Sequence, residues 1–148
     1  MPVERDNPYG NYNFIVEITG VDNPPHAGFS EVSGLGMEVT PIEYRAGSDK
    51  TNTTRKIPGL SKFANVVLKR GITGSTAMYE WMKDVRDGSD SIRQDVTIRM
   101  LDEQRQPVIT WKLSNAWPAK ICGPELKATG NEVAIESFEL THEGVTIE

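Results

Sequence analysis

The sequence predicts a mainly β fold: a small β-barrel or sandwich of two packed antiparallel sheets with one flanking α-helix. Apolar and polar residues alternate along most of the chain, which is typical of a sheet with one buried and one solvated face. Only one segment, at about residues 75–87, has its apolar residues at helical spacing. The 148 residues contain no repeat and no linker-like segment, so we expect a single domain over 1–148.

The first strands are expected near residues 12–19 and 37–45. The first of them alternates regularly, whereas the phase of the second slips by one residue at Pro41. Proline cannot donate a hydrogen bond to a neighbouring strand. The second strand is therefore expected to contain a bulge at Pro41 or to lie at the edge of a sheet. A further strand is expected at 63–70.

A long polar segment, about residues 46–62, is expected to be an extended loop. A connection of this length is uncommon in a compact domain and is usually functional or disordered. The segment contains no phosphate-binding glycine pattern, no metal ligands and no catalytic pair. On composition alone its basic residues indicate a solvated loop; in and around it these are Arg45, Lys50, Arg55, Lys56 and Lys62.

The expected helix has a large apolar stripe. Ser75 or Thr76 is suited to cap its first turn, and Gly88 to end its last turn. The stripe either covers the subunit's own sheets or partly contacts a neighbouring subunit. Its members, at positions i, i+3, i+4 and i+7, are Met78, Trp81, Met82 and Val85.

Strands are also expected in the C-terminal half. Residues 95–100 and 109–114 alternate strictly, and residues 102–106 between them resemble a hairpin turn. A last strand is expected over 133–140, again with a phase slip.

No pattern for catalysis or cofactor binding stands out in this chain. Cys122 is the only cysteine, so an internal disulfide cannot form. Neither His26 nor His142 has partners at metal-ligand spacing. The only G-x-G, Gly34 to Gly36, lacks the third glycine and the following helix of a dinucleotide site. We therefore expect no enzyme activity, no cofactor and no metal.

Charge and hydropathy exclude two further classes. A net charge of −5 argues against a specific nucleic-acid site, because phosphate binding requires clustered cations. No window approaches the ~18 apolar residues of a membrane-spanning helix. The N-terminus lacks the apolar core of a signal peptide, so synthesis in the cytoplasm is expected.

Seven segments together resemble the tail-tube (inner tube) proteins of contractile injection systems and contractile-tailed phages. They occur in the expected order and cover nearly the whole chain. The segments are NFIVEITG near the N-terminus, GFSEVSGL at 28–35, IEYRAG at 42–47, KIPGLSKFANVVLKRGIT at 56–73, YEWM at 79–82, WKLSNAWPAKI at 111–121 and GNEVAIESFELTHEG at 130–144.

The resemblance implies a structural subunit of a rigid tube. In this family six copies form a ring, and rings stack into a hollow tube that sheath contraction drives through a target envelope. It implies partners: further copies of the chain, the sheath, baseplate and spike proteins at one end, a cap or terminator at the other, and protein cargo in the lumen. The particle would be a phage tail or an injection system, released from the cell or anchored to a membrane.

The resemblance also implies that the 46–62 loop reaches the adjacent ring. Arg45, Arg55 and Lys56 are the expected charged contacts, with Asp49 and Lys50 beside them. Pro58, Gly59 and Leu60 are expected to form the returning turn. The N-terminal arm, 2–12, is a second candidate for contact between rings.

Two alternatives remain open at this stage. One is a secreted hexameric ring of a type VI secretion system that carries effectors in its lumen. The other is a ligand-binding β-barrel, which would need an apolar pocket open to solvent, whereas a small tube-forming barrel fills its interior with side chains.

Overall fold

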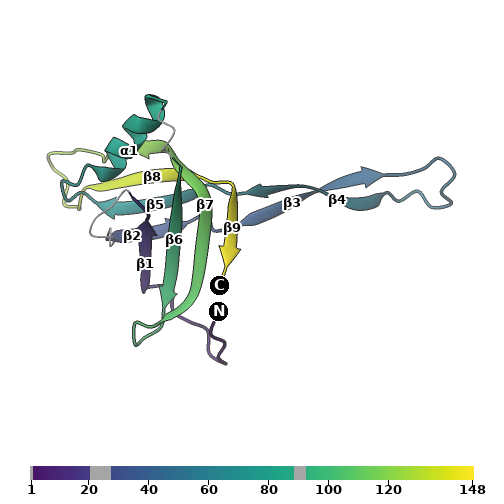
Figure 1. The fold of residues 1–148 in the computed structure, drawn as a ribbon, viewed down its shortest axis with the longest axis horizontal. Helices are drawn as coiled ribbons and strands as arrows, with labels where there is room; N and C mark the ends of the chain where they lie inside the picture. Colours follow the sequence, from purple (N-terminus) through teal and green to yellow (C-terminus); the bar gives the residue numbers. More distant parts are fainter. Residues whose placement is uncertain (1, 21–27, 89–92) are drawn as a thin grey trace.

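A computed structural model describes residues 2–20, 28–88 and 93–148, and it confirms a mainly β, antiparallel fold with one helix (Figure 1). His26 lies outside the described residues. The elements in chain order are β1 (Phe14–Ile18), β2 (Phe29–Ser33), β3 (Met37–Tyr44), β4 (Arg55–Phe63), β5 (Val66–Gly71), α1 (Ala77–Arg86), β6 (Gln94–Leu101), β7 (Pro107–Cys122), β8 (Ile135–Thr141) and β9 (Gly144–Ile147).

The body consists of two antiparallel sheets that share the long strand β7. The first half of β7 pairs with β6 and β9, and β1 pairs with β6. The second half pairs with β8, which is followed by β5 and β2. Between the halves Asn115 has a φ of 51°, a left-handed conformation that asparagine tolerates better than most residues. Its side-chain amide donates a 2.9 Å hydrogen bond to Glu143, which fixes the bend.

The core lies between the two sheets. Phe138, Leu68 and Leu140 face it from the second sheet, and Val96 and Leu113 face it from the first. The helix lies over β7. Met78 and Trp81 of the apolar stripe are buried in the core, Val85 packs against it, and Met82 is half-buried.

The two sheets do not close into a barrel. Strands β1 and β2 stand at the two ends of the strand order and do not pair with each other. The predicted pair of packed antiparallel sheets is therefore present as an open arrangement with free strand edges.

The segment expected as a loop over 46–62 is in part a strand. Strand β4 begins at Arg55 and pairs with β3, so the connection covers only residues 45–54. The strand expected at 63–70 is interrupted at residues 64 and 65, which separate β4 from β5. Nearly every residue of β4 is exposed. Alternation arises from burying one face, so a strand exposed on both faces lacks that signal.

The predicted ends of the helix and the predicted irregularity at Pro41 can be compared with the structure. The helix occupies 77–86 within the expected 75–87, with Thr76 at the N-cap position but without a capping hydrogen bond from its side chain. Gly88 has a φ of 77° and donates its N–H to Val85, as expected of the residue that ends a helix. The register of the β3–β4 pair shifts between Val39 and Pro41, which confirms the predicted irregularity at that proline.

Candidate assembly surfaces

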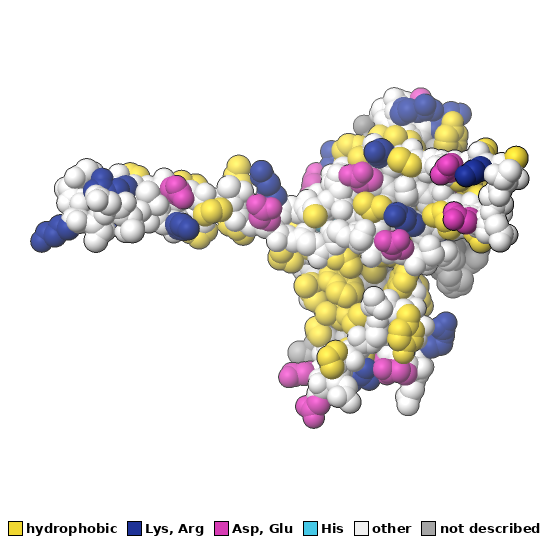
Figure 2. All heavy atoms as spheres, turned by 180° about the vertical axis from the view of Figure 1, so that it is seen from behind, with side chains coloured by type: hydrophobic (Ala, Val, Ile, Leu, Met, Phe, Trp, Pro, Cys, Tyr) yellow, Lys and Arg dark blue, Asp and Glu magenta, His cyan; other side chains and the backbone are white. Residues whose placement is uncertain are grey.

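The β3–β4 hairpin projects away from the body as a two-stranded ribbon (Figure 1). Almost all of its residues are exposed, including large apolar side chains that a monomer would normally bury. Figure 2 shows hydrophobic side chains along the hairpin and cationic side chains at its tip. The exposed apolar residues are Met37, Val39, Ile42, Tyr44, Ile57 and Leu60.

Both faces of this ribbon are apolar. At the register shift Thr40 stands opposite two residues of β4, Gly59 and Leu60, so the extra residue belongs to β4. Because the extra residue lies in β4, successive side chains of β3 point to opposite faces of the ribbon along its whole length. Met37 and Ile42, five positions apart, therefore lie on opposite faces. A partner would have to cover both faces to remove this apolar surface from water.

Pro58, Gly59 and Leu60 do not form the returning turn that was expected, because they lie inside β4. Pro58 stands opposite Pro41, so both missing backbone N–H groups fall at the same place in the ladder. A Cβ on Gly59 would lie 2.5 Å from the Thr40 carbonyl oxygen. The two strands approach each other so closely here that only a residue without a side chain fits.

The hairpin tip is held by its own charged groups. Arg45 donates hydrogen bonds to the carbonyl oxygens of Thr51 (3.0 Å) and Asp49 (3.2 Å). The Asp49 carboxylate accepts the backbone N–H of Ala46 at 3.0 Å and lies 3.7 Å from Arg55. Arg45 and Asp49, predicted as contacts between rings, are thus already engaged within the tip.

Three cations of the hairpin are available to a partner. Lys50, Lys56 and Lys62 have no ion-pair partner among the described residues, and all three are exposed. Of the charged residues predicted as contacts between rings, Lys50 and Lys56 are the two that the chain's own fold does not engage.

The base of the hairpin is fastened to the body from several sides. Gly34 has a φ of 88°, and a Cβ there would lie 2.1 Å from the Asn65 carbonyl oxygen. The N–H of Ala64 donates to Gly36, and Asn65 donates to Glu139 of β8 at 2.9 Å. Two chain segments distant in sequence are therefore held tightly together where the hairpin leaves the body.

His142 adds a further link at this base. Its ring nitrogens lie 3.0 Å from the Ala64 carbonyl oxygen and 3.2 Å from that of Gly144, and its ring packs against Phe63. A neutral imidazole carries one N–H, so it donates to one of the two carbonyls at a time. Spacing along the chain does not indicate this role, because the contacted residues lie up to 78 positions away.

The N-terminal arm, the second candidate for contact between rings, folds against the β6–β7 turn. Arg5 makes two 2.8 Å hydrogen bonds to the carboxylate of Glu103 and stacks over the ring of Tyr9. The N–H of Val3 donates to Val108. The hydrogen bond from Arg5 lowers the pKa of Glu103 to about 2.

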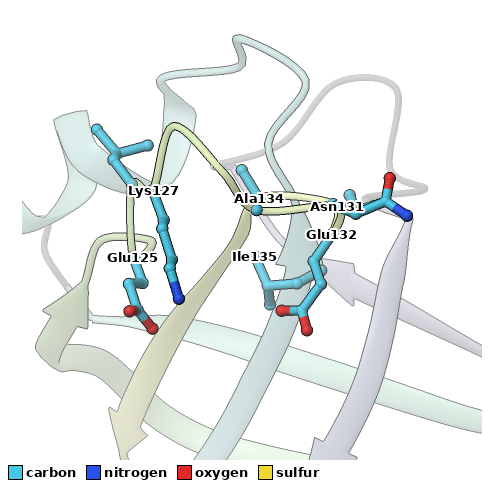
Figure 3. A pocket seen from close by; sticks show the side chains of 9 residues that line it. Glu125, Lys127, Asn131, Glu132, Ala134 and Ile135 are labelled. Carbon is cyan, nitrogen blue, oxygen red and sulfur yellow. The ribbon is translucent and has the colours of Figure 1, made fainter.

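The described surface is hollowed at the β7–β8 loop and between two strand edges. A groove of about 460 Å³ lies in the β7–β8 loop at the end of the molecule opposite the hairpin (Figures 1 and 3). A second, apolar cleft of about 290 Å³ lies between the free edges β1 and β2, lined in part by Phe14, Val32 and Trp111.

The described residues offer little for chemistry. No three of their His, Cys, Asp and Glu side chains gather closely enough to hold a metal ion. Among them there is also no helix with the length and hydropathy needed to cross a bilayer. What the described chain presents instead is free strand edges and an apolar protrusion, the features of a protein that associates with other chains.

A family model for the T4-like virus tail tube protein gp19 matches residues 10–146. The chain belongs to this tail tube protein family. A search of curated protein sequences found no match.

Solved structures of a contractile injection system and of the anti-feeding prophage are similar to this chain over nearly its full length. A chain of the PVC sheath–tube complex in the extended state is 29% identical, with a TM-score of 0.83, over 95% of this chain and 91% of that one. A chain from the tube-terminating cap of the anti-feeding prophage is 30% identical, with a TM-score of 0.82, over 100% of this chain and 95% of that one. These similar chains, like the family, are components of tubes.

Type VI secretion proteins share the fold at lower identity. Hcp1 from Flavobacterium johnsoniae is 15% identical, with a TM-score of 0.54, over 90% of this chain and 93% of that one. Identity at this level shows a common architecture.

Proposed function

We propose that the chain is the subunit of a rigid hollow tube in a phage-tail-like contractile injection system. Six copies form a ring, rings stack into a tube, and a contracting sheath drives the tube through a target envelope. The observation that carries this proposal is the exposed hairpin, apolar on both faces, in a chain of the tail tube family. A protrusion of this kind leaves the monomer with surface that only association can cover.

Ring closure follows from the free edges of the second sheet. Strand β2 and the 117–122 half of β7 end this sheet, and neither has a partner on its outer side among the described strands. Open edges favour pairing with another chain. A head-to-tail contact that closes by rotation makes a ring, and pairing β2 of one copy with β7 of the next would join the sheets into one large barrel.

The face of this sheet that points away from the core would then line the channel. On that face Lys69 lies 3.8 Å from Glu31, and Lys120 stands opposite Glu139. Serine and threonine side chains of β8 alternate with the core residues. Val67 and Ile135 are apolar residues on this face. A wall formed mainly by charged and hydroxyl side chains offers a passing protein little apolar surface to adhere to.

The similar structures come from a sheath–tube complex and from a tube-terminating cap, which supports a larger assembly of this kind. In the proposed assembly the sheath surrounds the tube, a cap or terminator binds one end, and baseplate and spike proteins bind the other, with protein cargo in the lumen. The chain has a structural and not an enzymatic role, and it needs no cofactor. It is made in the cytoplasm and becomes part of a particle that acts outside the cell or at its envelope.

Electron microscopy of the purified chain tests this proposal. We expect hexameric rings or stacked tubes with a central channel, and native mass spectrometry should give a mass of six chains. Because assembly can require a baseplate as a template, the same measurement is made after co-expression with the neighbouring genes. A chain that stays monomeric at all concentrations under both conditions would contradict the proposal.

A further inference from the structure

The hairpin and the β7–β8 loop, residues 123–134, lie at opposite ends of the molecule (Figure 1). Both extend from the second sheet, at opposite ends of its strands. The hairpin leaves between β2 and β5, whereas the loop joins β7 to β8 where β5 ends. The N–H of Ile72, just after β5, donates to the Ala134 carbonyl and fastens the loop to this end.

The loop encloses the groove of about 460 Å³ and presents apolar side chains beside it. Leu126 is 84% exposed and Val133 is 74% exposed, although both are large aliphatic residues. Ile135 lines the groove from the first residue of β8 (Figure 3). Apolar surface is thus exposed at the end of the sheet that faces away from the apolar hairpin.

The charges at the two ends are complementary. The groove is lined by Glu125 and Glu132 with a single cation, Lys127 (Figure 3). The hairpin carries the exposed Lys50 and Lys56, which have no ion-pair partner within the described chain. An anionic groove and a cationic protrusion favour encounter in one orientation.

We propose that the groove of the β7–β8 loop receives the β3–β4 hairpin of a second copy of this chain, which belongs to the next ring. Apolar residues of the hairpin, with Leu60 the most exposed, cover Leu126 and Val133, while Lys50 and Lys56 face Glu125 and Glu132. This inference rests on the proposed function and names the surface that binds the hairpin.

A protrusion and a groove at opposite ends explain why stacking continues. Each added ring presents a new free hairpin or a new free groove, so the contact is head-to-tail and does not close. The second cleft, between β1 and β2, lies on the flank of the body and not at the end opposite the hairpin. If copies stack along the direction of the hairpin, the hairpin of the next copy does not reach this second cleft.

Two matched double variants test the contact. Leu126→Asp with Val133→Asp disables the groove, and Ile57→Asp with Leu60→Asp disables the hairpin. All four side chains are exposed, so the fold should persist, which circular dichroism verifies. We expect each variant to form single rings, with tube length in micrographs reduced to that of one ring. Ile147→Asp, on the exposed C-terminal strand, is the control and should stack normally.

Mixing the two variants gives a sharper result. A hairpin-deficient ring keeps its groove, and a groove-deficient ring keeps its hairpin, so one intact contact forms between them. The mixture should yield stacks of two rings and no longer ones. Groove variants that form tubes of wild-type length would overturn the inference while leaving the proposed function intact. Absence of rings in the wild-type protein would instead contradict the proposed function.

Cross-linking identifies the residues that meet. In a Cys122→Ser background, Lys56→Cys combined with Glu132→Cys should give a ladder of covalently joined chains when assembled tubes are oxidised. Lys56→Cys combined with Met100→Cys, in the flank cleft, is the comparison and should give none. A ladder from the flank pair alone, or from neither pair in intact tubes, would overturn the assignment of the groove. The charge reversal Lys56→Glu should weaken stacking, and Glu132→Lys should restore it.

Discussion

Arg70 is the charged residue that the fold buries most completely within the described chain, with 4% of its surface exposed. Its guanidinium donates a 2.7 Å hydrogen bond to Glu136 on the neighbouring strand and another to the Ser75 carbonyl before the helix. It also lies 5.1 Å from the ring centre of Phe138. One side chain thus ties two strands to the start of α1. A buried ion pair of this kind orients its surroundings more than it stabilises them.

Replacing one member of this pair should be far worse than replacing both. Arg70→Met leaves the Glu136 carboxylate half-buried without its partner, which should lower the free energy of unfolding by about 3–5 kcal/mol. Arg70→Met combined with Glu136→Leu removes both charges, and its stability should lie close to wild type. Urea denaturation of the two variants measures the difference. A double variant as unstable as the single one would show that the pair itself provides the stability.

Glu103 gives the N-terminal arm a defined dependence on pH. Its pKa is lowered from 4.5 to about 2, chiefly by the hydrogen bond from Arg5. A lowered carboxyl pKa means that the contact stabilises the docked arm above about pH 4.5 and is lost as pH falls towards 2. The protection factor of the Val3 amide, which compares its hydrogen-exchange rate with that of an unstructured peptide at the same pH, should fall over this range. In Arg5→Gln the protection factor should be low at every pH, and an unchanged profile in that variant would contradict the assignment.

At the scale of elements, the sequence predicted the helix, the alternating strands β1, β5, β6 and β8, and the first half of β7, but it predicted no strand at β2, at β9 or in the second half of β7. Strands such as β6, where Val96 and Ile98 face the core, carry the alternation that burial imposes. Strand β4 carries none, because a ribbon exposed on both faces has no buried side to mark. The expectation of a long loop was therefore wrong for 55–62, and no pattern in the sequence predicted the groove of the β7–β8 loop. That groove depends on which strand ends meet in space, which spacing along the chain does not reveal.

Gly34 sets the path of the chain into the hairpin, and its replacement should show this. Gly34→Ala places a Cβ in a left-handed conformation, against the Asn65 carbonyl, and should lower the free energy of unfolding by roughly 1–3 kcal/mol. Gly47→Ala, at the hairpin tip, meets no atom within 4 Å and serves as the matched control. Chemical denaturation compares the two. Equal stabilities would mean that the base of the hairpin adjusts without strain.

At the scale of the whole molecule, folding and association use different residues. The buried core is formed by residues of the two sheets and the helix, and none of its members lies between Met37 and Phe63. The hairpin in turn contributes exposed apolar residues that no other described part of the chain covers. A subunit built in this way is able to fold before it meets a partner and to lose its protrusion without losing its core.

Removing the hairpin should therefore abolish stacking and spare the fold. The N–H of Ala64 donates a 3.2 Å hydrogen bond to the Gly36 carbonyl, so the two ends of the deletion already lie side by side. Joining Met37 to Phe63, which stand opposite each other, through a short Asn-Gly turn in place of residues 38–62 makes a tight connection and keeps Phe63 against His142. Thermal unfolding should stay cooperative, and the free energy of unfolding should change by less than about 1 kcal/mol, the range of substitutions away from a core. Size-exclusion chromatography with light scattering should find folded chains or rings but no tubes. Loss of cooperative unfolding would show that the hairpin belongs to the folding unit, and tubes of normal length would show that stacking uses another surface.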